Sequence, residues 1–518
     1  MRGEAMRRTK IVATLGPAVD SRGGIASVLR AGADVLRINL SHGERADHDR
    51  LMAASRSASA RVGRPVGVMV DLQGPRLRVG NMRGGSMVLR AGSEVTFTSR
   101  DVLGEGDVVP VGYDRLERDL RKGVRMLIDD ATIECKVLSV DRDGVRARVA
   151  RGGVLKDHKG INLPDIRISA PSVTDKDHED IRWAAGVDAD YVAVSFVRDA
   201  RTVRHVRDEL VRHGSDALII AKVELRDAVE HIGPIVDASD AVMVARGDLG
   251  VELPLEDVPI IQKRIVSVCN AHAKPSIIAT QMLESMTENP RPTRAEVSDV
   301  ANAILDGADA VMLSGETAVG LHPVETVRTM ARICEAMERA VPAKAPPLQG
   351  YSGALPIPVA VARSAVDLAE MVRASAIITF TTSGFTARHH SAARPQRPIL
   401  AVSPRESTVR RMSLLWGVRP ALVRPVEDAE GMIELAKRAA VREGVARPGS
   451  VVVIAAKLPL QARDSTNLIQ VQRIQLPHAG HGGPGGGERA RRRRGGGGGG
   501  GGSGGGRRGR GRGPRPGT

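Results

Sequence analysis

The chain has 518 residues, of which 42% are hydrophobic and only 2% aromatic, and its formal net charge is +16. This length predicts several domains, whose cores must be filled mainly by aliphatic side chains. No apolar run approaches the roughly 20 residues needed to span a bilayer, and no signal-peptide pattern follows the charged N-terminus. We therefore expect no membrane partner and a cytoplasmic location. The three cysteines lie far apart and form no CxxC pair, which argues against a disulfide framework or a zinc site built on cysteine.

The first predicted elements are short apolar runs that alternate with helical stretches over about the first 340 residues. Their near-continuous apolar character is typical of parallel strands buried on both faces. Most are separated by spans long enough for one crossover helix. Eight such units predict an α/β fold of the (β/α)8 TIM-barrel type. The predicted strands are residues 11–14, 34–38, 66–70, 191–195, 218–222, 241–244, 276–279 and 310–313.

The spacing between the third and fourth predicted strands is abnormal, because about 120 residues separate them. Residues 77–168 show an alternating, turn-punctuated pattern, which predicts a small all-β domain inserted into a barrel loop. A domain inserted at that end of the barrel could close over it as a lid.

A second α/β pattern begins near residue 346, with predicted strands near 376–381, 398–402, 420–424 and 450–455. We therefore expect five parts along the chain. They are the first part of the barrel (8–76), the lid (77–168), the second part of the barrel (169–345), a C-terminal α/β regulatory domain (346–476) and a tail (477–518).

The tail is rich in glycine and arginine. Residues 478–518 hold ten arginines and one glutamate, so they carry nine of the sixteen net positive charges. Such a composition cannot bury a core, and we expect disorder there. The tail resembles Arg-Gly segments that bind RNA, but it lacks the interleaved aromatic residues on which bases stack. A solubilising extension is the favoured interpretation, and RNA binding is the alternative.

Polar side chains follow seven of the eight predicted barrel strands, at the end where barrel enzymes place their functional groups. Glu224 and Asp248 follow neighbouring strands, and two carboxylates with substrate oxygens suit Mg²⁺ or Mn²⁺. Lys222 shares a strand face with Glu224, and a lysine beside a divalent metal can neutralise a phosphoryl group in transfer. One such carboxylate alone is more often a helix cap or a surface charge. Seven polar strand ends together predict metal-dependent phosphate chemistry.

The chain resembles the pyruvate kinase family over about residues 8–475. The segments that carry this resemblance are TKIVATLGP (9–17), RINLSHG (37–43), HKGINLP (158–164), AKVE (221–224), MVARGDLG (243–250), ATQML (279–283), PRPTRAEVSDVAN (290–302) and MLSGETA (312–318). The resemblance implies a barrel with a lid and a C-terminal α/β domain. It also implies phosphoryl transfer from phosphoenolpyruvate to ADP, the last step of glycolysis.

The resemblance also implies roles for individual residues. Glu224 and Asp248 would hold the divalent metal, and Lys222 would stabilise the phosphoryl group. The backbone at Gly247, with Thr280, would hold the substrate carboxylate, and Thr280 would belong to the proton relay that forms pyruvate. Further residues implied to bind substrate or nucleotide are Arg37, Asn39, His42, Arg78 and Lys159. For His42, packing within its loop is an equally weighted alternative, as helix capping is for Arg294 and Glu296.

The chain departs from the family at a monovalent cation site. Many members require K⁺, and the matching positions here are Asn39, Ser41, Asp71 and the carbonyl of Leu72. Leu72 resembles the members that dispense with K⁺. Arg76, where those members carry lysine, brings a charge that cannot be lost. We predict that K⁺ is dispensable.

The resemblance extends to assembly and regulation. Family members are usually tetramers, so a homotetramer is expected. Residues 381–388 (TTSGFTAR) resemble the family's phosphate-binding effector loop. Phe385 stands where members regulated by a sugar bisphosphate often carry a basic residue. A sugar monophosphate or AMP is therefore the expected effector, with an unregulated turn as the alternative.

Two rival functions remain open from the sequence. A metal-dependent aldolase of phosphoenolpyruvate or pyruvate would share the metal carboxylates, but it would lack the lid and the residues that grip ADP. A non-catalytic relative that binds RNA through its tail would be expected to have lost Lys222 or a metal carboxylate, and all three are present.

Overall fold

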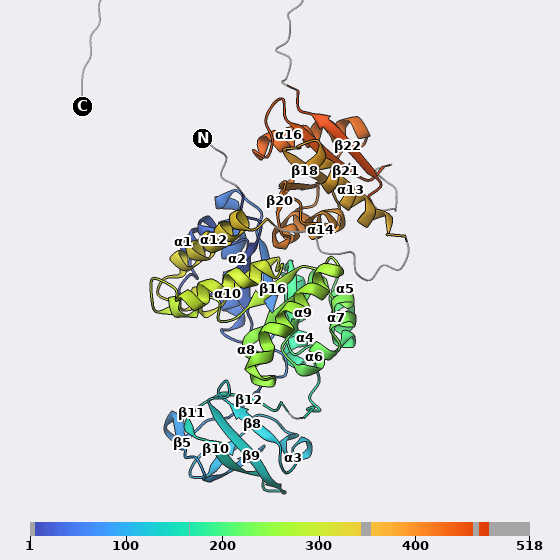
Figure 1. The fold of residues 1–518 in the computed structure, drawn as a ribbon. Coiled ribbons are helices and arrows are strands. Elements are labelled where there is room, and N and C mark those ends of the chain that lie inside the picture. Colours follow the sequence, from blue (N-terminus) through green and yellow to red (C-terminus); the bar gives the residue numbers. More distant parts are fainter. Residues whose placement is uncertain (1–5, 165, 343–353, 459–465, 476–518) are drawn as a thin grey trace, which may run out of the picture. The chain divides into compact units, whose positions relative to one another are not determined.

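The computed structural model describes residues 6–164, 166–342, 354–458 and 466–475. Eight parallel strands close into a barrel in the order β1-β17-β16-β15-β14-β13-β3-β2, which confirms the predicted fold class (Figure 1). Each predicted barrel strand is present to within one or two residues. The strands are β1 (Lys10–Thr14), β2 (Val35–Asn39), β3 (Gly67–Asp71), β13 (Tyr191–Val194), β14 (Leu218–Val223), β15 (Ala241–Ala245), β16 (Ser276–Ala279) and β17 (Ala310–Leu313).

The two faces of these strands are buried against different partners. Side chains on the inner face fill the barrel. Because aromatic residues are scarce, these side chains are mainly alanine, methionine, isoleucine and valine, with Tyr191 as the exception. Side chains on the outer face pack against the surrounding helices. Burial on both faces explains why the strands appear in the sequence as near-continuous apolar runs.

Eleven helices belong to the barrel part of the described chain. The capping-box pairs Thr174 with Asp177 and Thr293 with Glu296 begin two of them, α4 and α10. None of the helices in the described residues is long and apolar enough to cross a membrane. The helices are α1 (Arg22–Ala31), α2 (Arg45–Val62), α4 (Asp175–Gly186), α5 (Ala200–Arg212), α6 (Arg226–Glu230), α7 (Ile232–Ala238), α8 (Arg246–Glu252), α9 (Val258–Ala271), α10 (Arg294–Leu305), α11 (Gly315–Ala318) and α12 (Pro323–Ala340), with short 3-10 turns at η2 (Leu255–Asp257) and η3 (Glu284–Thr287).

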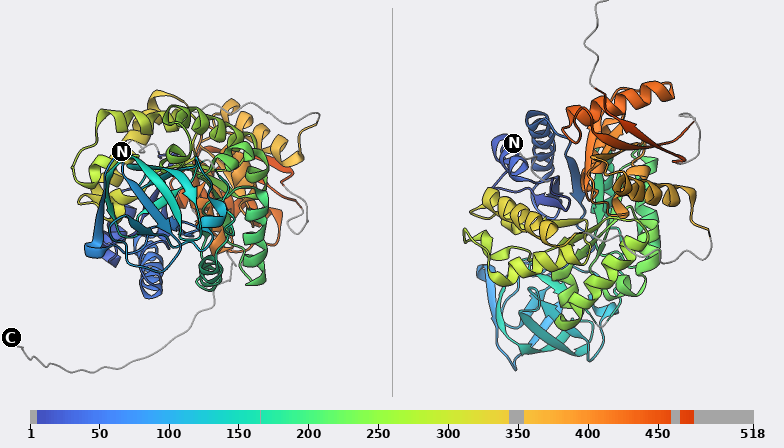
Figure 2. Two further views of the ribbon diagram at one scale, coloured as in Figure 1. Left: turned by 90° about the horizontal axis from the view of Figure 1, so that it is seen from below. Right: turned by 45° about the horizontal axis from the view of Figure 1, so that its top comes forward.

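The chain leaves the barrel after β3 and builds an all-β insertion before it returns at α4. A seven-stranded sheet and a two-stranded sheet form the insertion, which has its own apolar core (Figure 2). The sheet order is β4 (Leu77–Arg78), β12 (Gly160–Asn162), β8 (Arg125–Ile128), β9 (Ile133–Val140), β10 (Val145–Arg151), β6 (Glu94–Thr98) and β7 (Val108–Pro110). The smaller sheet pairs β5 (Ser86–Leu89) with β11 (Gly153–Lys156), and the short helices are η1 (Arg83–Gly85) and α3 (Leu116–Asp119).

The connection from β3 into the insertion depends on Gly74. Its backbone has a φ of +69°, and a Cβ there would lie 2.8 Å from a ring carbon of Phe196, so only glycine fits. The Gly74 N–H donates to the Asp177 carboxylate at 3.0 Å. The segment that leads into the insertion is therefore held by the first turn of α4, the helix that follows the insertion.

The C-terminal part is a five-stranded sheet in the order β20 (Val418–Leu422), β19 (Ile399–Ser403), β18 (Ala376–Phe380), β21 (Val451–Ala456) and β22 (Leu468–Arg473). Its helices are α13 (Ile357–Met371), α14 (Phe385–Ala392), α15 (Glu406–Arg411), η4 (Met412–Leu414) and α16 (Ala429–Arg442). The antiparallel edge strand β22 was not predicted. Among the described residues only β21 pairs with it, and β22 is half-exposed, so polar residues interrupt its apolar ones.

The predicted tail lies outside the described residues, as do residues 343–353 before the C-terminal domain and residues 459–465 between β21 and β22. The domain boundaries predicted from the sequence stay predictions.

Candidate active site

A cavity of about 350 Å³ opens where the barrel strands end. It receives polar side chains from β1, β2 and β14 and from the segments that follow the other strands. Among the predicted site residues, those that line it are Arg37, Asn39, Ser41, His42, Arg76, Lys222, Glu224, Asp248 and Thr280. Strand ends that are far apart in the sequence therefore converge on one chamber, as the barrel topology requires.

Lys222 is at the centre of an ion-pair network on the cavity wall. Its Nζ lies 2.8 Å from Glu224 Oε1 and 3.2 Å from Asp71 Oδ1. It also donates a hydrogen bond to the Ser195 hydroxyl at 2.7 Å. Burial alone would lower the pKa of Lys222, but the two carboxylates outweigh burial and raise this pKa above its usual value. The ammonium group is thus charged and fixed in position at neutral pH.

Two side chains hold Arg37 in position at the cavity. Its Nε donates to Asp71 Oδ2 at 2.6 Å, and its Nη1 donates to the Thr14 hydroxyl at 3.1 Å. Asp71 is fully buried, which by itself would raise its pKa, but Lys222 and Arg37 together lower it. Asp71 therefore stays ionised and orients both cations toward the cavity.

Glu224 and Asp248 are the carboxylates that line the cavity. Glu224 is 2% exposed and accepts a hydrogen bond from the Phe196 N–H at 2.6 Å. Phe196 holds the left-handed φ of 52° that aims this N–H. Burial raises the pKa of Glu224, and the charge of Asp248 raises it further against the opposing effect of Lys222. A cation bound near both groups would relieve this crowding of negative charge.

Thr280 follows β16 in a strained conformation. Its φ is 69°, which a β-branched residue rarely adopts. The Thr280 hydroxyl accepts from the Gly247 N–H at 2.8 Å and donates to the Ala279 carbonyl at 2.6 Å. The guanidinium of Arg246 donates to the Thr280 carbonyl at 2.7 Å and pairs with Asp299 at the same distance. Such strain is typical of functional sites, and here it places a hydroxyl in the cavity.

A group of positive charges lies on one side of the cavity. Burial lowers the pKa of His42, and the nearby charges of Arg78, Arg37 and Arg76 lower it further. Burial and the charge of Arg76 likewise lower the pKa of Arg78. Positive charges gathered in this way attract an anion, so this side of the cavity is suited to bind a phosphate.

Two predicted ligands belong to the inserted domain and do not line the cavity. Arg78 donates to the His158 carbonyl at 2.8 Å, and Lys159 forms an ion pair with Asp129 at 2.7 Å. Gly247, Asp71 and Leu72 contact site residues without lining the cavity.

Ser195, Thr14 and Arg246 support the site and had no role in the sequence interpretation. Ser195 and Arg246 directly follow their strands, and Thr14 ends the first one. In the sequence these three residues stand out only as polar residues at strand ends. That polarity does not indicate which partner each side chain contacts. Glu296 pairs with Thr293 in the capping box that begins α10, and it also accepts a hydrogen bond from the Ser285 N–H. The structure therefore favours the helix-capping interpretation of Glu296.

The eight-stranded barrel has an inserted β-domain and a cationic cavity in which a lysine pairs with buried carboxylates. This arrangement is the one expected of a phosphotransferase. Comparisons with known proteins identify the family. The chain matches the family descriptions "Pyruvate kinase, barrel domain" over residues 6–327 and "Pyruvate kinase, alpha/beta domain" over residues 359–472.

Relatives match over nearly the same span. The chain is 43% identical to a pyruvate kinase of Geobacillus stearothermophilus over 474 residues, which cover 90% of this chain and 80% of the relative. It is also 43% identical to a pyruvate kinase of Corynebacterium glutamicum over 475 residues, covering 90% and 98%. A crystal structure of a pyruvate kinase from Cryptosporidium parvum matches with a TM-score of 0.85 at 34% identity, covering 90% and 96%. The chain belongs to the pyruvate kinase family, and its reaction is phosphoryl transfer from phosphoenolpyruvate to ADP.

Proposed function

We propose that Lys222, Arg37, Glu224, Asp248 and Thr280 carry out this reaction in the cavity. The observation that carries the proposal is the fixed ammonium group of Lys222, held against Glu224 and Ser195 where a phosphoryl group can be bound. Phosphoryl transfer depends on positioning and charge neutralisation more than on covalent chemistry, and a preformed cationic site provides both.

The divalent metal would be held by Glu224 and Asp248. Their donor set is entirely oxygen, which favours a hard cation, and we propose Mg²⁺, with Mn²⁺ as the alternative. The raised pKa of Glu224 beside Asp248 supports the fit, because two neighbouring carboxylates favour a bound cation. When bound, the metal would polarise substrate oxygens and neutralise developing charge.

Phosphate binding would fall to the cations around the cavity. Arg37 is oriented by Asp71 and can make paired hydrogen bonds to a phosphate. We propose that Asn39 and His42 contact the nucleotide, and that Arg78 and Lys159 of the inserted domain join them when this domain closes. Closure would also exclude water from the phosphoryl group.

Thr280 would serve both the substrate carboxylate and the proton relay. Its hydroxyl already bonds the Gly247 N–H, and both groups lie in the first turn of chain after a strand. We propose that the backbone at Gly247 binds the carboxylate, while the Thr280 hydroxyl passes the proton that converts enolpyruvate to pyruvate.

A coupled assay separates this function from its rivals. The purified chain is supplied with phosphoenolpyruvate, ADP and Mg²⁺, and pyruvate formation is followed. We expect pyruvate to form only when ADP is present. Pyruvate chemistry that proceeds without ADP would indicate the aldolase alternative, and no turnover together with salt-dependent RNA binding would indicate the non-catalytic one.

We predict that activity is nearly the same in Na⁺ and in K⁺. Three of the four proposed K⁺ ligands already accept hydrogen bonds inside the chain. The Asn39 amide oxygen accepts from Ser41 N–H, Asp71 accepts from Arg37, and the Leu72 carbonyl accepts from Ser195. Arg76 adds positive charge to the same cavity. Initial rates in Na⁺, K⁺ and the inert cation choline test this, and a large gain in K⁺ alone would contradict it.

The C-terminal domain offers a place for an effector. A cavity of about 420 Å³ is lined by the loop 380–386 and by Arg424 and Lys457. Within the loop, the Thr381 hydroxyl accepts from the Gly384 N–H at 2.9 Å. Hydroxyl and amide groups beside two cations suit one phosphate group, so we propose a sugar monophosphate or AMP as the effector.

We predict that AMP or a sugar monophosphate raises the rate at subsaturating phosphoenolpyruvate. Arg424→Gln should abolish this response and leave the basal rate unchanged, because the charge is lost from the effector cavity only. Arg419→Gln is the matched control, since Arg419 pairs with Glu443 and does not line that cavity. An unregulated turn is indicated if neither compound changes the rate of the unaltered chain.

We further propose a homotetramer, from the family resemblance, and a cytoplasmic location, from the sequence pattern. Light scattering of the purified chain measures the first. The proposed function of residues 477–518, a solubilising extension, is tested by comparing the solubility and RNA binding of chains with and without them.

A further inference from the structure

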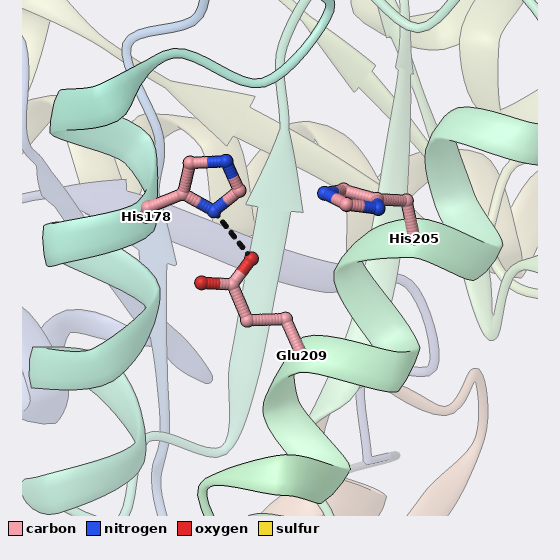
Figure 3. A group of neighbouring side chains, drawn as sticks. All are labelled: His178, His205 and Glu209. Carbon is pink, nitrogen blue, oxygen red and sulfur yellow. Dashed lines mark hydrogen bonds and ion pairs between the residues drawn. The ribbon is translucent and has the colours of Figure 1, made fainter.

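A second group of metal-ligating side chains lies on the outside of the barrel, between α4 and α5. His178 comes from α4, and His205 and Glu209 come from α5. One ligand atom from each residue lies within 4.8 Å of the other two. Figure 3 shows the three side chains pointing into the same space between the two helices.

The backbone holds this group in place. His205 and Glu209 are four residues apart, so they lie on the same face of α5. Buried apolar residues fix α4 against α5, among them Ile181, Ala184, Val203 and Val206. The positions of the three side chains are therefore set by a packed helix pair.

Glu209 is buried, with its side chain only 5% exposed. Its Oε2 lies 2.7 Å from His178 Nδ1, and within the described residues no lysine or arginine pairs with it. A buried carboxylate is normally matched by a full positive charge. A histidine supplies that positive charge only when it is protonated. A bound metal ion would supply it instead, so the His178–Glu209 pair is suited to bind one.

His205 lies beside this pair without a hydrogen bond of its own in the part of the chain that the structure describes. Its ring packs edge-on against the His178 ring, with 5.6 Å between centroids and 78° between planes. The His205 side chain is solvent-exposed. Its ring nitrogens are therefore available to a ligand, next to the buried His178–Glu209 pair.

We propose that His178, His205 and Glu209 bind a divalent transition metal ion, for which Zn²⁺ is the probe. Two imidazole nitrogens and one carboxylate suit Zn²⁺ and its neighbours, whereas Mg²⁺ and Ca²⁺ prefer oxygen ligands. Water from the exposed side completes the coordination. The ion displaces the proton shared by His178 and Glu209, which passes to solvent.

The geometry requires small side-chain movements. With metal–ligand distances of about 2.0–2.1 Å, the ligand atoms of a tetrahedral site are about 3.3 Å apart. The His178–Glu209 contact must open slightly from 2.7 Å, and the His205 nitrogen must approach its partners from within 4.8 Å. Rotation of the exposed His205 ring accomplishes this without moving the helix backbone.

This site is separate from the active site, since none of its three residues lines the active-site cavity. It is next to Asp177, whose carboxylate accepts from Gly74 at the start of the inserted domain. A bound ion joins α4 to α5 at this point, and we expect it to stabilise the fold. The proposal does not depend on the reaction at the barrel mouth.

Zinc binding to the full-length chain tests the proposal. Excess Mg²⁺ occupies the catalytic carboxylates, and a chromogenic chelator competes for Zn²⁺. We expect one zinc ion per chain at the new site and a rise in melting temperature with Zn²⁺. His205→Ala should weaken this binding on the order of tenfold or more and remove the rise. His213→Ala is the matched control, because His213 is exposed just after the same helix.

A purely structural His178–Glu209 pair predicts a different outcome. His205→Ala leaves that pair intact, so zinc affinity and the zinc-dependent melting temperature would equal those of the unaltered chain, and the proposal would be overturned. Glu209→Gln gives a second readout. Substituted Co²⁺ should show the visible absorption of a low-coordinate site in the unaltered chain, and this absorption should be lost in both variants. Its persistence in both would also overturn the proposal.

Discussion

Replacing Lys222 by methionine should lower kcat by about 10²–10³-fold or more. The ammonium group is a fixed positive charge that contacts Glu224 and Ser195 at the cavity wall. Methionine keeps an unbranched side chain that is one atom shorter and removes the charge, so the phosphoryl group in transfer loses its stabilisation. Steady-state assays with phosphoenolpyruvate and ADP measure kcat and KM separately, and the loss should appear mainly in kcat.

The same substitution also affects stability, because Asp71 and Glu224 would lose the cation that compensates them. Breaking a buried ion pair from one side costs about 3–5 kcal/mol. Thermal unfolding and circular dichroism must therefore accompany the kinetic assay. Lys263→Met is the matched control, since Lys263 pairs with Asp306 on the surface and should leave kcat unchanged. A folded Lys222→Met chain with near-normal kcat would contradict the role assigned to this residue.

Replacing Glu224 by glutamine should raise the Mg²⁺ concentration needed for half-maximal activity by about 10²-fold or more. The amide oxygen can still accept from the Phe196 N–H, so the local backbone keeps its support. The ligand charge is lost, and with it much of the affinity for a hard divalent cation. Activity as a function of Mg²⁺ and of Mn²⁺ measures the effect.

Glu252→Gln is the control for this second prediction. Burial raises the pKa of Glu252 to about 7, so near neutral pH this residue is already partly uncharged and an amide is a small change. Its Mg²⁺ dependence should match that of the unaltered chain. If Glu224→Gln and Glu252→Gln show the same Mg²⁺ dependence, Glu224 does not hold the metal.

The barrel could be predicted from the sequence because the burial of each strand determines the residue types within that strand. A strand buried on both faces is mostly apolar, and the eight strands show this in the sequence as near-continuous apolar runs, with charged exceptions at the site such as Arg37 in β2 and Lys222 in β14. The edge strand β22 was not predicted because one side of it meets solvent. Its polar and apolar residues are therefore mixed, and no continuous apolar run marks it in the sequence. The inserted domain was visible as a change from a continuous apolar pattern to an alternating one, as in β10.

The candidate site was predictable to the level of its charged groups. Topology brings the ends of parallel strands to one place, so Lys222, Glu224 and Asp248 could be expected to meet. Their partners could not be derived in this way. Asp71 was interpreted only as a K⁺ ligand, and in the structure it also orients Lys222 and Arg37. Thr14 and Ser195 gave no signal beyond their polarity.

The sequence by itself determined the barrel, the insertion, the C-terminal α/β pattern and the kind of chemistry at the strand ends. These features follow from burial and periodicity, which determine residue types over short segments of the chain. Only the tertiary structure decided which charges neutralise one another. The pairing of Asp71 with two cations and the approach of Arg78 to His42 depend on contacts between distant segments. The meeting of His178 with Glu209 depends on how two helices pack. Such contacts are set by side-chain geometry in three dimensions, and no spacing along the chain encodes them.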